Sequence, residues 1–358
     1  MMIPVLTYHS ISQYSKITPT CFEEHLKFLL NSGYSFRFAS ELPEKINNAK
    51  ATSKEIAMTI DDGYYDVYEY VFPLIKKYGV KITVFLITSR IGNHDGEVLD
   101  AHKAHQQYIE KQKKSGFLNI DNIIEMQKSG IVEFQSHSHS HLLHYSNNKI
   151  HSFYNPDFIH HWSLPYAANH YLVTGMPLYR LYPSLAFKRF LPSKKSLRRV
   201  SEKCKEILAE KNLPSNWEKV EKKLHIFCKR EKNNYLSDDE SMESESNYIK
   251  RIKNDLKRSK ELIEEIVSAR VELMSLPWGV YNSALLQIAE EVGYKLAFSL
   301  ESKRKTSFLY PRIVINKGNI QELEKRLSPI NGFFKKVSYF FIDSQKNYWS
   351  PQKEKKEN

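Results

Sequence analysis

Residues 55–63 read EIAMTIDDG, a largely apolar run followed directly by two carboxylates and a glycine. Its largely apolar first part predicts a buried strand, which runs directly into two adjacent carboxylates, Asp61 and Asp62. Carboxylates are costly to bury at the end of an apolar strand unless a cation or hydrogen bonds compensate them. A helix N-cap is the alternative interpretation, because a helical pattern over residues 65–78 comes next.

Short buried strands and helices alternate on both sides of this stretch. The expected strands are 3–8, 35–38, 55–60, 81–87, 131–134, 272–275, 296–300 and 313–315. One helix is expected to start near residues 18–20, and three further helices are expected over 65–78, 119–128 and 283–292. Such alternation with Gly-marked turns is typical of parallel strands. We predict an α/β fold, a β/α barrel that is closed or incomplete, with a largely helical insertion.

The alternating pattern breaks between residues 145 and 247. This part has scattered aromatic and proline residues, a basic run, and an acidic segment over 237–246 (SDDESMESES) that we expect to be solvated. An amphipathic helix follows, in which Ile252, Leu256, Ser259 and Ile263 recur at helical spacing. We predict one catalytic domain over 1–345, interrupted by the 145–247 insertion, and a polar tail over 346–358.

Composition limits the class of protein. The formal net charge is +12, but no nucleic-acid-binding signature is present, so a solvated basic surface is the first interpretation and a membrane-facing patch the second. Cys21, Cys204 and Cys228 lack CxxC spacing, which argues against a disulfide framework or thiolate metal site. Residues 1–10 read as a strand rather than a signal peptide, and no run of about 18 apolar residues occurs. We therefore expect a cytoplasmic chain.

A second polar cluster follows another expected strand: residues 135–144 read QSHSHSHLLH. His137 and His141 are four residues apart, so on a helical turn their rings meet on one side, which suits two ligands of one metal. His139 and His144 could replace them, and a polar loop without a metal is the remaining alternative. One Asp with two His would leave coordination positions open for water and substrate, with the other Asp available as general base.

Both motifs together resemble the polysaccharide deacetylase family, the family 4 carbohydrate esterases, and in particular its poly-N-acetylglucosamine deacetylase branch. Residues 59–63 (TIDDG) resemble the family motif T-F-D-D-G, and residues 133–141 resemble its H-[ST]-x-x-H motif. The resemblance extends over about 1–90, 116–144 and 249–327, so the insertion lies outside it. It implies a deacetylase-type barrel in which Asp61 is the general base. Asp62, His137 and His141 would bind a divalent metal, by preference Zn²⁺, with Co²⁺, Ni²⁺ or Fe²⁺ as alternatives.

Further roles follow from the same resemblance. The first strand ends in LTYHS, and in that branch the His of this strand is the general acid, a role that falls to His9. The third motif, R-x-P-[YW]-G, reads SLPWG over 275–279, so its usual Arg is missing. Arg312 is the candidate replacement and also a candidate substrate contact. The backbone N–H of Trp278 would bind the oxyanion while its ring lines the groove, unless Trp278 is a core aromatic. Tyr64 is a further expected substrate contact.

The implied reaction is hydrolysis of the N-acetyl group of an amino sugar, in a glycan or glycan precursor, with release of acetate. A deformylase of a lipid-linked amino sugar, a ring-opening amidohydrolase and a non-catalytic glycan-binding relative remain as alternatives. The expected partner is an N-acetylated sugar, and no nucleic acid is expected. A cytoplasmic chain favours a lipid-linked or nucleotide-linked sugar at the inner membrane face, with 333–341 (FFKKVSYFF) as a candidate membrane contact or a last barrel strand.

Overall fold

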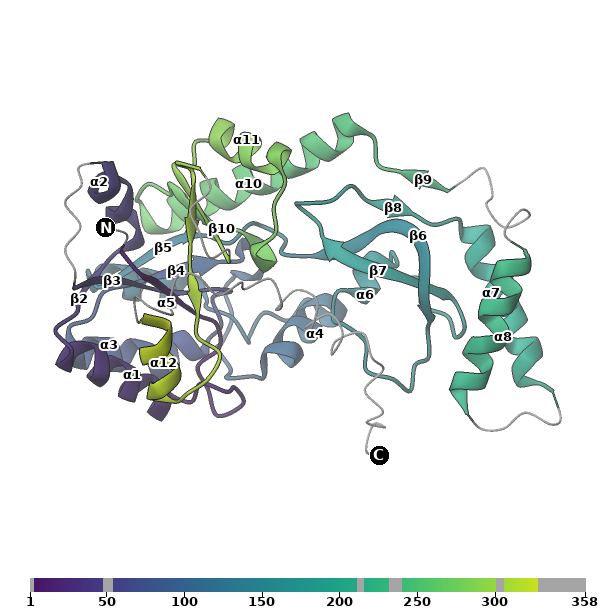
Figure 1. Cartoon of the computed structure of the whole chain (residues 1–358), viewed down its shortest axis with the longest axis horizontal. Helices are drawn as coiled ribbons and strands as arrows, with labels where there is room; N and C mark the ends of the chain where they lie inside the picture. Colours follow the sequence, from purple (N-terminus) through teal and green to yellow (C-terminus); the bar gives the residue numbers. More distant parts are fainter. Residues whose placement is uncertain (1–2, 48–53, 211–215, 232–239, 301–305, 328–358) are drawn as a thin grey trace. The chain divides into compact units, whose positions relative to one another are not determined.

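The computed structural model of the chain describes residues 3–47, 54–210, 216–231, 240–300 and 306–327 (Figure 1). These residues divide into two compact units. The first ends at His141 and resumes at Arg251, and the second runs from Leu142 to Lys250. The predicted tail over 346–358 and the candidate membrane contact over 333–341 lie outside the described residues.

The first unit is built on a parallel sheet, in which the described residues contribute nine strands. The strand order is β12-β11-β10-β5-β4-β3-β1-β13, and β2 pairs beside β3. The strands are β1 (Val5–Tyr8), β2 (Ser35–Arg37), β3 (Glu55–Ile60), β4 (Ile82–Leu86), β5 (Val132–Ser136), β10 (Leu273–Ser275), β11 (Leu296–Ser299), β12 (Leu309–Pro311) and β13 (Ile313–Val314). In the described part of the chain these strands pair in parallel.

One short segment forms both ends of this sheet. β12 pairs with β11 through Ala297 and Leu309, and β13 pairs with β1 through Leu6 and Ile313. Only Arg312 separates β12 from β13, so the two ends of the strand order are joined by a single residue. The sheet is therefore a nearly closed barrel, and the predicted β/α architecture is confirmed.

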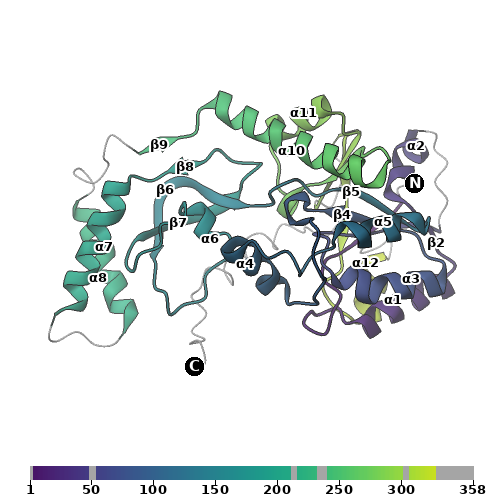
Figure 2. The same ribbon diagram turned by 180° about the vertical axis from the view of Figure 1, so that it is seen from behind.

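Helices surround this sheet. They are α1 (Pro19–Asn31), α2 (Leu42–Asn47), α3 (Phe72–Tyr78), α4 (Ala101–Lys111), α5 (Ile120–Lys128), α10 (Glu245–Val267, of which this unit contains the part from Arg251), α11 (Ser283–Val292) and α12 (Ile320–Leu327). Short helical turns are η1 (Ala39–Glu41), η2 (Val67–Val71), η3 (Thr88–Arg90) and η4 (Pro277–Gly279). Helices α1, α3 and α12 group together, and α10 lies beside α11, in both views (Figures 1 and 2).

An apolar core fills the barrel. Val5, Leu273 and Leu296 open their strands and pack in one buried cluster with Phe298 and Tyr310. This apolar cluster includes the amino ends of these strands, and the polar side chains lie at the opposite, carboxyl ends. Among the described helices, none combines the length and the apolar character needed to cross a bilayer.

The second unit contains β6 (Leu143–Phe153) paired antiparallel with β7 (Pro177–Pro183), and β8 (Phe190–Leu191) paired with β9 (Ser241–Met242). Its helices are α6 (Leu164–Ala167), α7 (Lys194–Leu208) and α8 (Trp217–Arg230), and α7 lies beside α8 (Figure 1). The insertion was expected to be largely helical, so the β6–β7 pair is a difference. Buried and exposed residues do not alternate along β6, so its sequence shows no strand periodicity, and the strand is defined by its pairing with β7.

Candidate metal centre

Polar side chains meet where the barrel strands end. His9 follows β1, Asp61 follows β3, and His137 follows β5, while Ser275 ends β10 and Arg312 joins β12 to β13. Because the strands are parallel, their carboxyl ends lie at the same rim of the barrel, where active sites of β/α folds are built. Residues far apart in sequence are thereby brought to one place.

A left-handed turn places the two carboxylates. Asp62 and Gly63 both have φ of 72°, and a Cβ on Gly63 would lie 2.6 Å from Cδ2 of Leu86, so the turn requires glycine there. Oδ2 of Asp61 lies 3.8 Å from Nε2 of His137, and Oδ1 of Asp62 lies 3.4 Å from the same atom. The following helical turns begin only at η2, so the carboxylate pair is not their N-cap.

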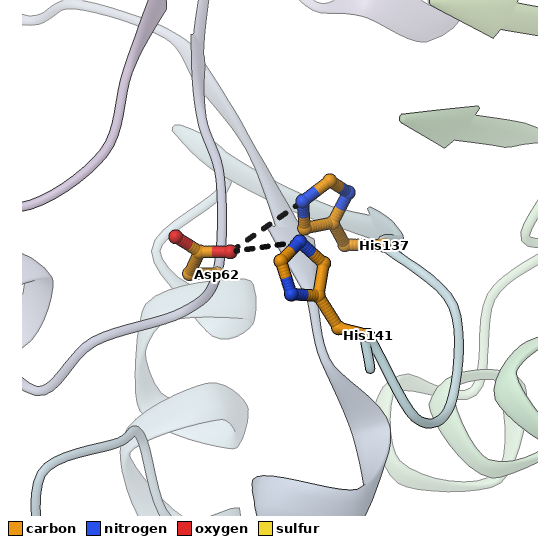
Figure 3. Close-up of side chains that lie close together, drawn as sticks. All are labelled: Asp62, His137 and His141. Carbon is orange, nitrogen blue, oxygen red and sulfur yellow. Dashed lines mark ion pairs between the residues drawn. The ribbon is translucent and has the colours of Figure 1, made fainter. Parts of the chain in front are cut away.

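Asp62, His137 and His141 each direct one ligand atom into a common site, and these atoms lie within 4.8 Å of one another (Figure 3). Oδ1 of Asp62 is 3.4 Å from Nε2 of His137 and 3.7 Å from Nε2 of His141. Two tetrahedral ligands of Zn²⁺ at about 2.1 Å lie about 3.4 Å apart, so these separations fit one cation. No donor in the described part of the chain bonds to the buried Oδ1 of Asp62.

Protonation also favours a cation at this site. Nδ1 of His137 lies 2.9 Å from the carbonyl oxygen of Ser275. A carbonyl only accepts, so Nδ1 donates to it and Nε2 is the ring nitrogen on the side of Asp62. Burial, and then the charges of His137 and His105, hold the pKa of His141 well below its usual value, so that ring is neutral. A buried carboxylate between two imidazole rings is costly without a compensating cation, and the residues therefore fit a divalent metal.

The backbone that carries the two histidines differs from the prediction. A helical turn was expected between them, but the structure has an irregular loop with φ of 71° at Ser138 and 47° at His141. Two successive N–H groups of this loop, from His139 and Ser140, donate to the carboxylate of Asp255 on α10. The prediction of a helical turn is wrong because these two N–H groups donate to a side chain that is distant in sequence and not to carbonyl groups of the preceding turn.

The competing histidines have other contacts. Nδ1 of His139 lies 2.9 Å from Oγ1 of Thr88, and Nε2 of His144 lies 3.1 Å from the carbonyl oxygen of Phe187. Neither belongs to the three-residue cluster that the structure assembles. The geometry thus supports His137 and His141 as the histidine pair.

Asp61 is held by a buried network. Arg312 donates to both of its carboxylate oxygens at 2.8 Å, and Ser275 Oγ donates to Oδ2 at 2.9 Å. Burial would raise the pKa of Asp61, but the guanidinium of Arg312, together with His137, outweighs it and holds that pKa well below its usual range. The bonds of Arg312 to Asp61 favour a steering role, in place of the missing motif Arg, over the substrate contact also expected.

His9 and Trp278 flank this network. His9 is exposed at the end of β1, and its charge contributes to lowering the pKa of Asp61. Trp278 is half-buried, and its ring centroid lies 4.9 Å from that of His141. Its φ of 62° is a left-handed conformation, which costs a residue with a side chain roughly 1–3 kcal/mol. Such strain fits a functional position better than the alternative of an ordinary core aromatic.

Tyr64 is buried beside the candidate metal site. Its hydroxyl lies 2.9 Å from Nε2 of His105, and its ring stacks on Phe117 with centroids 5.4 Å apart. His105 in turn stacks beside His141 at 6.2 Å. These contacts place Tyr64 in the packing around the metal centre, and its contact with substrate stays a prediction.

Sequence reasoning missed several residues around the centre. Ser275 was noted only as the position without Arg, and Asp255 was overlooked although Ser259, in the apolar stripe of its helix, signalled a polar contact. Oδ2 of Asp66 accepts from Ser10 Oγ at 2.5 Å and from Ile11 N–H at 3.0 Å, directly after His9. Burial raises the pKa of Asp66 to about 7.

Comparison with known proteins agrees with this geometry. The polysaccharide deacetylase family model matches residues 48–161, which include Asp61, Asp62, His137 and His141. Residues 48–161 thus resemble a polysaccharide deacetylase domain. This confirms the family resemblance seen in the two motifs.

Two relatives match part of the chain in sequence. YxkH of Bacillus subtilis, whose name describes it as a polysaccharide deacetylase, is 34% identical over 143 residues, which are 39% of this chain and 43% of the relative. The poly-beta-1,6-N-acetyl-D-glucosamine N-deacetylase of Staphylococcus aureus strain MSSA476 is 27% identical over 129 residues, 36% of this chain and 39% of the relative. The matched part thus spans about two fifths of each relative's length.

A solved structure shares the fold. The deacetylase domain of BpsB from Bordetella bronchiseptica superposes with a TM-score of 0.54 at 17% identity, covering 87% of this chain and 95% of that one. At this identity the likeness shows the architecture alone.

Proposed function

We propose that this chain is a metal-dependent deacetylase that hydrolyses the N-acetyl group of an amino sugar, in a glycan or a glycan precursor, and releases acetate. One observation carries the proposal: Asp62, His137 and His141 converge on a single site while Asp61, held by Arg312, lies beside them. The deacetylase domain and its relatives support the same reaction class.

Zn²⁺ is the metal we propose for Asp62, His137 and His141, because carboxylate and imidazole ligands with an open position are typical of catalytic zinc. Co²⁺, Ni²⁺ and Fe²⁺ are the alternatives for such ligands. When bound, a cation of this kind polarises a carbonyl oxygen and lowers the pKa of water to roughly 7.

The side chains around the metal supply the proton transfers. Asp61 is ionised at neutral pH because Arg312 stabilises its charge, so it accepts a proton from the attacking water. His9, exposed at the rim, protonates the departing amine. The backbone N–H of Trp278 donates to the oxyanion that develops on the acetamide carbonyl. Ser275 keeps Asp61 oriented through its hydroxyl.

The substrate we propose is an N-acetylated sugar, the class that the name of the Staphylococcus aureus relative specifies for that protein. A cytoplasmic location, and a lipid-linked or nucleotide-linked sugar at the inner membrane face, remain our proposal from the sequence. Vesicle flotation with and without residues 328–358 would test the membrane contact, and equal flotation of both chains would argue against it.

The central experiment measures acetate release from a panel of N-acetylated sugars by the metal-stripped chain before and after addition of Zn²⁺. We expect activity only after addition. Formate release from N-formylated sugars, assayed in parallel, would instead identify a deformylase. Sugar binding without either product would favour a glycan-binding relative.

Variants assign the two carboxylates. Asp61→Asn should abolish turnover and keep one bound metal, whereas Asp62→Asn should lose the metal. The reverse pattern would exchange the two roles. His144→Asn is the matched control, because His144 contacts Phe187 instead of the centre, and it should keep its metal.

A further inference from the structure

Asp255 on α10 reaches the metal-binding loop, residues 137–141, although it lies more than a hundred residues further along the chain. Its Oδ1 accepts the N–H of His139 at 2.8 Å, and its Oδ2 accepts the N–H of Ser140 at 3.1 Å. Both oxygens of one carboxylate are therefore used by consecutive backbone donors between the two histidine ligands.

The same helix holds the start of the loop one turn later. Ser259 Oγ lies 2.8 Å from Oγ of Ser136, and both side chains are buried. Oγ of Ser136 also accepts the N–H of Ser138 at 3.2 Å. Since residues four apart share a helix face, Asp255 and Ser259 together present one polar edge of α10 to the loop.

The loop needs such support because its backbone is strained. Ser138 and His141 both have positive φ, and each such residue with a side chain costs roughly 1–3 kcal/mol. Charge-assisted hydrogen bonds from backbone N–H groups to a carboxylate are about twice as strong as neutral ones and can hold this conformation.

The two ligands do not depend on Asp255 equally. His137 directly follows β5, and its ring is also fixed by the carbonyl of Ser275. His141 lies at the far end of the loop, beyond the two N–H groups that Asp255 binds. A shift of the loop would therefore displace His141 first.

We propose that Asp255 is a positioning residue that holds the 137–141 loop in the conformation in which His141 reaches the metal. This inference rests on the metal centre of the proposed function. It assigns α10 a role in metal binding besides its packing on the barrel.

The test measures affinity for Zn²⁺ alone, by competition with a chromophoric chelator, without any sugar. Loss of a residue that orients a metal ligand typically costs 10–100-fold in metal affinity, and we expect that loss for Asp255→Ala. Asp255→Asn keeps one acceptor oxygen and should lose less. The control is Glu261→Ala, which removes an exposed carboxylate that pairs with Lys257 on the same helix, and this variant should bind Zn²⁺ like wild type.

Coordination is read separately from the absorption bands of the Co²⁺-loaded protein. Displacement of His141 should change these bands in Asp255→Ala and leave them unchanged in Glu261→Ala. If Asp255→Ala does not fold, Asp255→Asn decides alone through the same two measurements.

The outcomes separate this inference from the proposed function. Unchanged Zn²⁺ affinity and Co²⁺ spectrum in a folded Asp255→Ala would overturn the positioning role and leave the deacetylase proposal standing. A wild-type chain that binds no Zn²⁺ would overturn the metal centre, and both proposals with it. Normal metal binding without acetate release would count against the reaction alone.

Discussion

Replacement of Arg312 by Met tests the electrostatic reasoning about the site most directly. Asp61 is 1% exposed and Arg312 is 3% exposed, with both carboxylate oxygens accepting from the guanidinium at 2.8 Å. Removing one partner of a buried pair typically costs about 3–5 kcal/mol, because a charge is left without compensation. A charge pair at about 4 Å with an effective dielectric constant of 20 gives about 4 kcal/mol, which agrees.

The cost should depend on pH. In the wild type the folded-state pKa of Asp61 is lowered, so its stabilisation is present above the unfolded value of about 3.9 and is lost as the pH falls. Without Arg312 burial dominates and raises that pKa. The protonated carboxyl of Asp61 then favours folding at low pH. This contribution is lost as the pH rises through the raised folded-state pKa. Arg312→Met should therefore lose more stability at pH 8 than at pH 5.

Urea unfolding of the metal-free protein in EDTA, followed by circular dichroism at both pH values, measures the effect. The double variant Asp61→Asn with Arg312→Met is the control and should be less destabilised than the sum of the two single changes. A loss below about 1 kcal/mol at both pH values, or the same loss at both, would refute the reasoning.

Three further changes have defined outcomes. His9→Asn should lower the rate of acetate release by about 10²–10⁴-fold at unchanged Zn²⁺ content, and near-normal rates would remove His9 as general acid. Gly63→Ala places a Cβ 2.6 Å from Leu86 at positive φ, so we expect at least 1–3 kcal/mol of destabilisation in urea; an unchanged midpoint would contradict it. Tyr64→Phe removes the hydroxyl contact to His105 and should cost about 1–2 kcal/mol, whereas a more stable variant would show that the contact contributes nothing.

Much of the barrel could be predicted because its strands are short apolar runs that end at polar residues. β3 is buried along its whole length and occurs where residues 55–60 were expected to form a strand. The positions of Asp61, Asp62 and His137 followed from the same rule, since they come just after a strand, whereas His141 was chosen for its spacing from His137. Local sequence was sufficient for these elements because parallel strands order their carboxyl ends.

The supporting residues could not be found in this way. Arg312 was only a candidate, because its pairing with Asp61 spans 251 positions and no local pattern encodes it. Asp255 lies in a helix whose periodicity reports apolar packing and hides a single polar contact. The helical turn between His137 and His141 failed for the same reason: the partner that unwinds it is distant in sequence.

The segment from β12 to β13 has a consequence for biosynthesis. During translation Asp61 emerges long before Arg312, so the nascent chain holds this carboxylate without its cation until the last barrel strands leave the ribosome. Closure of the sheet and completion of the hydrogen-bond network around Asp61 then occur together. A polypeptide that stops short of that segment would lack both the strands that join the two ends of the sheet and the guanidinium that pairs with Asp61.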